Sequence, residues 1–202
     1  MKNALFIFCL TLVFNFSLSA QKRVQNMHLY CDMGLNYTGG FNFSTSKTLI
    51  PKVGYTANVY HEHQFNGGNT IRVGIGHSLN GFAFDNRFTN VLHLFNLNTP
   101  LLYGKKLKNR QKIYIGVIPS YTFKIFYTEL LNSYSPSKFD AKLNLTYSKA
   151  INPMVGYELT GQIGTINVGV FEGGYMMNWA LSSKLYLKFL TNKSEAFFPS
   201  DD

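Results

Sequence analysis

The sequence has little charge, little cysteine and no long apolar run beyond its first twenty residues. Charged residues make up 14% of the 202 residues, against about a quarter in typical soluble domains. The two cysteines are Cys9 and Cys31, which excludes a multi-cysteine zinc site. A Gly-rich phosphate loop and a Ser-His-Asp spacing are also missing. The sequence therefore carries no motif of these enzyme or metal-binding classes.

Apolar and aromatic residues are abundant instead. Hydrophobic residues reach 46% and aromatic residues 16%, with 18 Phe, 13 Tyr and 17 Gly. A chain of this composition can bury a core or present a membrane face, and it is not expected to be disordered. Its length fits one domain with or without a processed segment.

The N-terminal segment reads as a secretory signal peptide at residues 1–20, which leaves a single domain at residues 21–202. Lys2 supplies the positive start, residues 4–14 the apolar stretch, and small residues precede the cleavage zone. Cleavage after Ser19 and cleavage after Ala20 both fit. An exported chain without an apolar helix is soluble, peripheral or a β-barrel.

The basic balance, +9 at pH 7, raises the question of an anionic partner. Basic residues are scattered through the expected turns and strands rather than gathered in one stripe, so nucleic acid is not expected. We expect this charge to face anionic lipid, including the phosphates of lipopolysaccharide, or an acidic partner.

The central stretch, residues 91–123, carries the architecture. Two apolar, alternating segments at residues 91–103 and 112–123 flank a short polar run. Each has about the length that a tilted strand needs to cross a bilayer. Two such strands joined by a tight polar turn form the repeating unit of a transmembrane β-barrel.

Period-two alternation predicts further strands, at residues 27–37, 51–65, 70–79, 151–160, 165–177 and 183–191. Boundaries around residues 139–155 stay open. The predicted connections alternate between short turns (66–69, 104–111, 161–164) and longer loops (38–47, 80–90, 126–149), which is the outer-membrane pattern with short turns in the periplasm. We therefore predict an all-β, eight-stranded antiparallel up-and-down transmembrane β-barrel in the cell outer membrane.

Three prolines, Pro100, Pro119 and Pro153, fall inside predicted strands. Proline cannot donate a hydrogen bond to a sheet. Either these positions are bulges or strand rims, or the strands around them are misassigned.

Alternation also predicts a set of inward charges: Asp32, Lys52, Glu62, Arg72, Lys124, Glu158, Glu172, Lys184 and Lys188. They can be interpreted as a substrate-binding track or as a salt-bridged plug. An eight-stranded barrel is just wide enough for side chains to fill it, and buried charges need partners. We favour the plug and expect no open diffusion pore.

Two local patterns suggest chemistry. Lipid A 3-O-deacylases are barrels with a His-x-Ser-Asn motif, and residues 76–80 contain His77 and Ser78. Because these two residues are adjacent, a strand sends their side chains to opposite faces, whereas a nucleophile and its base must lie within about 3 Å. His61 and His63 share a face but have no third ligand nearby. We therefore predict no catalytic, cofactor-binding or metal-binding residues.

Residues 98–103 (Asn-Thr-Pro-Leu-Leu-Tyr), 115–119 (Ile-Gly-Val-Ile-Pro) and 172–175 (Glu-Gly-Gly-Tyr) resemble motifs of the PorT-like outer-membrane β-barrel family of Bacteroidetes. The resemblance implies a barrel with a role in envelope maintenance, adhesion or support of a secretion apparatus. Partner contacts, including a possible envelope protein, would then be carried by the outer loops, above all residues 127–149.

We thus expect a non-enzymatic membrane component. Two alternatives remain at this point. One is a lipid A deacylase-like hydrolase using Ser78. The other is a soluble periplasmic ligand-binding barrel, whose interior would be lined by Leu29, Val53, Val73 and Val117.

Overall fold

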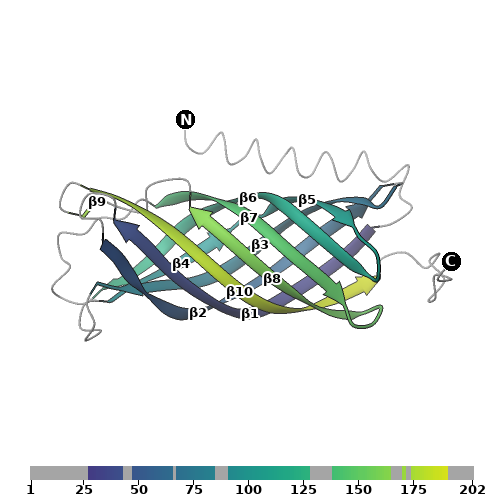
Figure 1. The fold of residues 1–202 in the computed structure, drawn as a ribbon, viewed down its shortest axis with the longest axis horizontal. Coiled ribbons are helices and arrows are strands. Elements are labelled where there is room, and N and C mark those ends of the chain that lie inside the picture. The colour runs from purple at the N-terminus through teal and green to yellow at the C-terminus, as the bar shows by residue number, and fades with distance from the viewer. Residues whose placement is uncertain are drawn as a thin grey trace.

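The computed structural model describes residues 27–42, 47–65, 67–84, 91–127, 138–164, 170–171 and 174–190. The expected signal peptide and the predicted inward residue Glu172 lie outside these ranges. All regular structure in the described part of the chain is β-strand (Figure 1). No helix in this part is long and apolar enough to cross a membrane.

The strands form one closed antiparallel ring. They are β1 Met27–Asn42, β2 Lys47–Gln64, β3 Asn69–Ala83, β4 Val91–Asn98, β5 Leu101–Lys106, β6 Gln111–Tyr127, β7 Phe139–Ala150, β8 Val155–Gly164, β9 Val170–Phe171 and β10 Gly174–Leu190. Each pairs with its neighbour, and β1 pairs with β10 to close the ring. β4 and β5 share the place between β3 and β6, and β9 pairs only with the first residues of β10, outside the ring. The wall therefore has eight positions, as predicted.

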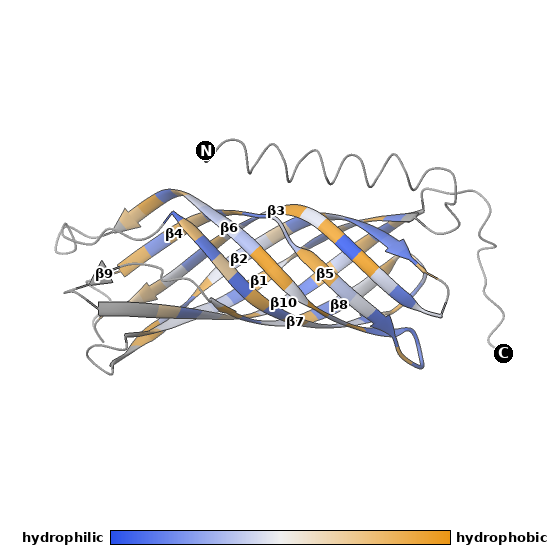
Figure 2. Ribbon diagram, turned by 90° about the horizontal axis from the view of Figure 1, so that it is seen from above, coloured by the Kyte–Doolittle hydropathy of each residue, from blue (hydrophilic) through white to orange (hydrophobic). Residues whose placement is uncertain are grey.

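Alternation decides which way each side chain points. In β1, Met33 is 69% exposed whereas its neighbour Asp32 is 4% exposed. In β10, Leu185 is exposed and Lys184 is buried. Successive side chains of a strand point to opposite faces, so each strand places its polar residues inside and its apolar residues outside. Figure 2 shows the two kinds of residue alternating along the wall.

Pro100 and Pro153 mark places where predicted strands fail, whereas Pro119 does not. The predicted strand at 91–103 breaks between β4 and β5 at Thr99 and Pro100. The neighbouring strands β3 and β6 hydrogen-bond to the residues of this break. Gly74 N donates to Pro100 O at 3.0 Å, and Thr99 N donates to Pro119 O at 2.9 Å. Pro119 stays within β6, and Pro153 lies in the turn between β7 and β8.

The second half of the chain corrects the prediction. Residues 139–150, taken as part of a loop, form β7, and the expected turn at 161–164 lies within β8. The short turn is instead at residues 151–154. β10 is one long strand that covers parts of two predicted ones. The predicted number of eight strand positions in the wall is nevertheless correct. The prediction missed β7 but divided β10 between two predicted strands.

β7 was missed because its inward face is almost wholly polar. Asp140, Lys142 and Asn144 are buried, whereas Leu143 and Leu145 are exposed. A loop and a strand with a polar lumenal face look alike in a short sequence window. The outer loop expected at 127–149 is therefore confined to the segment before β7.

Lys124 does not point inward as predicted. The pairing of β4 with β6 shifts register, so that Asn96 faces Thr122 but Phe95 faces Lys124. This bulge turns Lys124 to the outside, where it is exposed and its Nζ lies 4.4 Å from the ring centre of Phe126. One extra residue in a strand reverses the faces of those that follow.

The two ends of the barrel differ. One end, on the right in Figure 1, holds the start of β1, the end of β10 and the short connections at 65–68, 107–110 and 151–154; we call it the turn end. The opposite loop end holds longer connections at 84–90 and 128–138. The connection expected at 38–47 is shorter than predicted, because β1 and β2 extend into it.

The outer wall is apolar and is edged by aromatic rings. Exposed apolar side chains come from every long strand, including Leu35, Val53, Ile75, Ile115, Leu145, Leu159 and Leu181. Near the loop end, Tyr37 and Trp179 have ring centres 5.9 Å apart. Near the turn end, Tyr147 and Tyr157 have ring centres 6.4 Å apart. An apolar band between two aromatic girdles is the outer surface of a membrane barrel.

Inside the turn half of the barrel, tyrosines face glycines across neighbouring strands. Tyr114 is paired in register with Gly104, and Tyr60 with Gly74. A Cβ on Gly104 would lie 2.4 Å from Tyr114 Cδ1, far inside van der Waals contact. The missing side chain thus makes room for the ring.

This packing predicts the effect of adding one methyl group. Gly104→Ala should lower the free energy of unfolding by about 1–3 kcal/mol through overpacking, measured by denaturant titration of the barrel folded into lipid vesicles. Gly161→Ala is the matched control, because its Cβ would meet only Leu181 Cδ2 at 3.8 Å. Equal stability of the two variants would contradict the interlocking of tyrosine and glycine.

Candidate functional site: an ion-paired network inside the barrel

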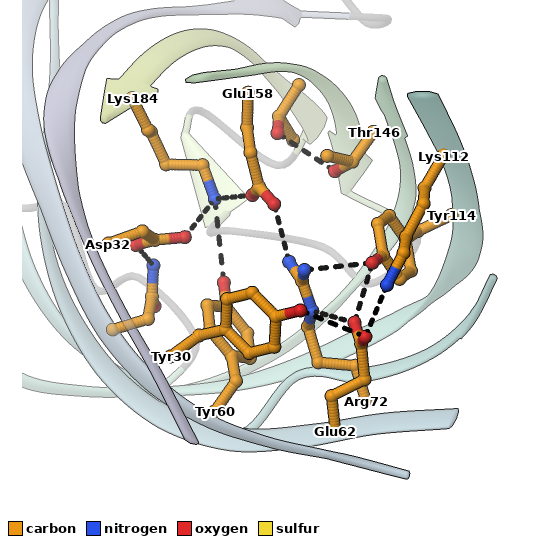
Figure 3. A network of polar contacts seen from close by, with 12 residues as sticks. Tyr30, Asp32, Tyr60, Glu62, Arg72, Lys112, Tyr114, Thr146, Glu158 and Lys184 are labelled. Atoms are coloured by element: carbon orange, nitrogen blue, oxygen red, sulfur yellow. Dashed lines mark hydrogen bonds and ion pairs between the residues drawn. The ribbon is translucent and has the colours of Figure 1, made fainter. Parts of the chain in front are cut away.

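Arg72 of β3 lies at the centre of the turn half of the barrel and is 1% exposed. Its Nη1 contacts Glu158 Oε1 at 2.6 Å and its Nε contacts Glu62 Oε2 at 3.2 Å. Its Nη2 donates to Tyr114 Oη at 2.9 Å (Figure 3). The guanidinium therefore uses each of its three nitrogens, with a carboxylate on two sides.

Three tyrosine rings surround the same guanidinium. Arg72 Cζ lies 4.8 Å from the ring centre of Tyr30, 5.0 Å from that of Tyr60 and 4.1 Å from that of Tyr114. The ring faces attract the cation. The hydroxyls of Tyr114 and Tyr30 also donate to Glu62, at 2.6 and 3.2 Å. The rings therefore stabilise both charges of the ion pair.

Lys184 and Lys112 extend the network to both sides. Lys184 Nζ lies 2.5 Å from Asp32 Oδ2 and 3.2 Å from Glu158 Oε2. Asn58 Nδ2 donates to the other oxygen of Asp32 at 2.6 Å. Lys112 Nζ lies 2.6 Å from Glu62 Oε1. Figure 3 shows these side chains converging from the surrounding wall.

The network is neutral in charge and spans the interior. Three carboxylates (Asp32, Glu62, Glu158) meet three cations (Arg72, Lys112, Lys184). β3 and β8 stand opposite one another in the ring order, so the Arg72–Glu158 pair crosses the lumen. Taking a single charge out of water costs several kcal/mol. Because the carboxylates and cations are equal in number and paired, six charged groups can lie inside the barrel.

Next to the charged network, amide and hydroxyl side chains fill the interior of the barrel. Asn36 Nδ2 donates to Asn80 Oδ1 at 2.8 Å, and Ser120 Oγ donates to Asn98 Oδ1 at 2.8 Å. Towards the loop end a buried apolar cluster of Leu49, Phe82, Leu92 and Leu94 joins the polar filling. A cavity of about 10 Å³ beside Lys142 and Asn178 has room for about one water molecule.

Most of the predicted inward charges meet in this network. Asp32, Glu62, Arg72, Glu158 and Lys184 are buried and in contact, as the plug predicts. Lys52 and Lys188 are half-buried and stand in register with the buried Thr38 and Tyr30. Lys124 is the wrong member of the set, for the reason given above.

The prediction missed several participants. Lys112 shares its face with Tyr114, so extending the alternation by one residue pair would have found it. Tyr30 and Tyr60 share the inner face of their strands with Asp32 and Glu62, but alternation alone does not identify them as partners of a cation. Asp140 and Lys142 were missed together with β7. Asp140 accepts a hydrogen bond from Asn178 at 3.0 Å.

His77 and Ser78 do not form a catalytic pair. The His77 ring lies on the outer wall among Tyr55, Phe95 and Phe123, with ring centres 5.4, 6.1 and 5.6 Å away. Ser78 is buried on the inner face and its Oγ accepts a hydrogen bond from Asn98 at 3.0 Å. The wall thus separates the base from the hydroxyl.

Two further alternatives raised by the sequence, a metal site and an apolar ligand cavity, can be compared with the described residues. Among the described residues, no group of three or more His, Cys, Asp or Glu could hold a metal ion. The soluble-barrel alternative required Leu29, Val53, Val73 and Val117 inside. Val53 is 64% exposed, and Leu29 and Val117 are also exposed on the outer wall. The apolar lining predicted by the soluble-barrel alternative was therefore wrong.

The fold is similar to solved outer-membrane barrels. Neisserial surface protein A matches with a TM-score of 0.52 and 16% identity, covering 80% of this chain and 97% of its own. Ail, the attachment invasion locus protein of Yersinia pestis, in complex with the heparin analogue sucrose octasulfate, matches with a TM-score of 0.51 and 9% identity, covering 82% of this chain and 100% of its own. At these identities the likeness concerns the fold.

The fold is thus that of the small outer-membrane β-barrels, in agreement with the outer-membrane localisation expected from the sequence. No protein-family model and no curated protein matches this chain. The resemblance to the PorT-like family therefore has support at the coarser level of a small outer-membrane barrel.

Glu158→Gln tests the network without changing side-chain size. It leaves Arg72 and Lys184 buried with one carboxylate fewer, and breaking a buried pair costs about 3–5 kcal/mol. Denaturant titration in lipid vesicles should show a loss of this order. Lys138→Gln, at an exposed position, should leave stability within about 0.5 kcal/mol. A Glu158→Gln barrel as stable as the unaltered one would show that the network contributes little.

Proposed function

We propose that this protein is a non-enzymatic component of the bacterial outer membrane, a closed barrel that presents its loop-end segments at the cell surface. The observation that carries the proposal is the filled interior, in which the Arg72–Glu158 pair crosses the lumen at 2.6 Å. A barrel blocked in this way serves as a rigid mount rather than a path for solutes.

Its surface role is proposed to be adhesion, envelope maintenance or support of a secretion apparatus. Adhesion draws support from the likeness to Ail, the attachment invasion locus protein of Yersinia pestis. The motifs at 98–103 and 115–119 support the finer proposal of a PorT-like barrel of Bacteroidetes, exported by a signal peptide at residues 1–20. Contacts with an envelope partner would involve the segment between β6 and β7.

The membrane partner proposed for the outer leaflet is lipopolysaccharide. Lys124 and Lys138 are exposed near the loop end, which is the extracellular end if the short turns lie in the periplasm. Lys124 also contacts the Phe126 ring at the outer wall. A cation beside an aromatic ring at this level suits a lipid phosphate.

Because its interior is filled, the barrel is expected not to conduct ions. Purified barrel in a planar lipid bilayer should show no steady single-channel conductance. The double variant Arg72→Ala, Glu158→Ala removes the crossing pair and should conduct, provided that a gel shift between unboiled and boiled samples shows it to be folded. Steady conductance by the unaltered protein would refute the plug.

The enzyme alternative has its own measurement. Incubation of the purified barrel with lipid A should leave the acyl chains intact, because His77 and Ser78 lie on opposite faces of the wall. Mass spectrometry of the lipid would reveal any released fatty acid. Release that disappears in Ser78→Ala would replace the non-enzymatic proposal with a deacylase.

A further inference from the structure

In the described residues the carboxylates lie only inside the barrel, whereas cations lie both inside and outside. The four carboxylates that the described residues contain, Asp32, Glu62, Asp140 and Glu158, are all buried. Within the same residues, the exposed charged side chains are all cations: Lys105, Lys106, Lys108, Arg110, Lys124 and Lys138. The outer surface of the described barrel therefore carries cations without carboxylates to neutralise them.

Four of these cations lie in one hairpin at the turn end. Lys105, Lys106, Lys108 and Arg110, which we call the basic turn, occupy the junction of β5 and β6. Four positive charges within six residues repel one another. The chain holds them together at a place where it shows no anion of its own among the described residues.

Hydrogen bonds fix the geometry of the basic turn. Leu107 N donates to Gln111 O at 2.8 Å, and Gln111 N donates to Lys108 O at 3.3 Å. Ala150 N donates to Arg110 O at 3.1 Å, which ties the turn to the end of β7. The cations are therefore presented by an ordered turn rather than by a loose segment.

The last cation of the basic turn occupies a backbone conformation that is unfavourable for a long side chain. Asn109 and Arg110 have φ of 57° and 59°, the conformation of the two central residues of a type I′ turn. Glycine is favoured at the second of these positions, and a long side chain there is strained. Arg110 occupies it nonetheless, with its side chain exposed.

The level of the basic turn along the barrel axis points to its partner. On the outer face of β5 the exposed apolar residues are Leu101 and Tyr103. Lys105 follows two residues later on the same face, about 7 Å further along the strand. The headgroup layer of a bilayer is roughly 5–8 Å thick on each side. The basic turn therefore begins at headgroup level, just beyond the apolar band.

We infer that the basic turn binds the phosphates of anionic phospholipid headgroups in the leaflet at the turn end. An open hollow beside it, between the β2–β3 and β5–β6 connections, is lined by Gly67, Gly68, Lys106 and Lys108 together with Gln64 and Leu107. Lys106 N donates to Gly68 O at 2.8 Å and holds the two connections together. This inference rests on the proposed membrane placement.

The test uses the full-length barrel folded into phosphatidylcholine vesicles that contain a trace of spin-labelled lipid. At low salt, about 50 mM NaCl, labelled phosphatidylglycerol should associate with the protein at least roughly threefold more strongly than labelled phosphatidylcholine. The variant Lys105→Gln, Lys106→Gln, Lys108→Gln, Arg110→Gly should lose this preference. Glycine at position 110 suits the turn, so this variant is expected to fold.

The matched control removes the exposed cations of the other end. Lys124→Gln, Lys138→Gln should retain the preference for phosphatidylglycerol. Equal preference in the basic-turn variant and the control would overturn the inference. So would loss of the preference when millimolar inorganic phosphate is added at constant ionic strength, because free phosphate would then be the ligand.

A folding control separates this inference from the proposed function. A gel shift between unboiled and boiled samples reports insertion of the closed barrel. A protein that shows the shift but no preference for phosphatidylglycerol would overturn only the lipid site. A protein that fails to insert into the phosphatidylcholine vesicles with either labelled lipid would overturn the membrane proposal and the lipid site with it.

Discussion

The contact between Arg72 and Glu158 is the interaction on which the interior depends, because it joins opposite walls of the ring at 2.6 Å. Around it, Glu62, Lys184 and the tyrosine hydroxyls satisfy the remaining charges. An eight-stranded barrel leaves little room for water, so each charge needs a partner within the protein. The narrow lumen thus converts scattered polar residues into one connected network.

This interior changes the usual meaning of a protein core. The exposed apolar side chains face outward, whereas the buried set is dominated by charged residues, amides, hydroxyls and tyrosines. Apolar burial occurs chiefly against lipid, and hydrogen bonds fill the inside. The apolar cluster of Leu49, Phe82, Leu92 and Leu94 is confined to the loop end.

The same constraint shapes the outer surface. Because the described carboxylates are used inside to pair with Arg72 and the lysines, no carboxylate of the described residues remains outside to pair with the exposed cations. Four of the six exposed cations of the described residues lie in the basic turn. On the inference drawn above, anionic lipid headgroups supply the counter-charge of the basic turn.

The sequence by itself determined which face each residue of a regular strand occupies, since alternation assigned Asp32 inward and Met33 outward without knowledge of any neighbour. It also determined that His77 and Ser78 could not meet. Tertiary structure decided the rest: the bulge that turns Lys124 outward, the strand status of residues 139–150, and the partner of Arg72. Those features depend on register between strands and on ring closure. A bulge or a pairing across 86 positions has no local signature, because its energy arises only once distant strands are side by side.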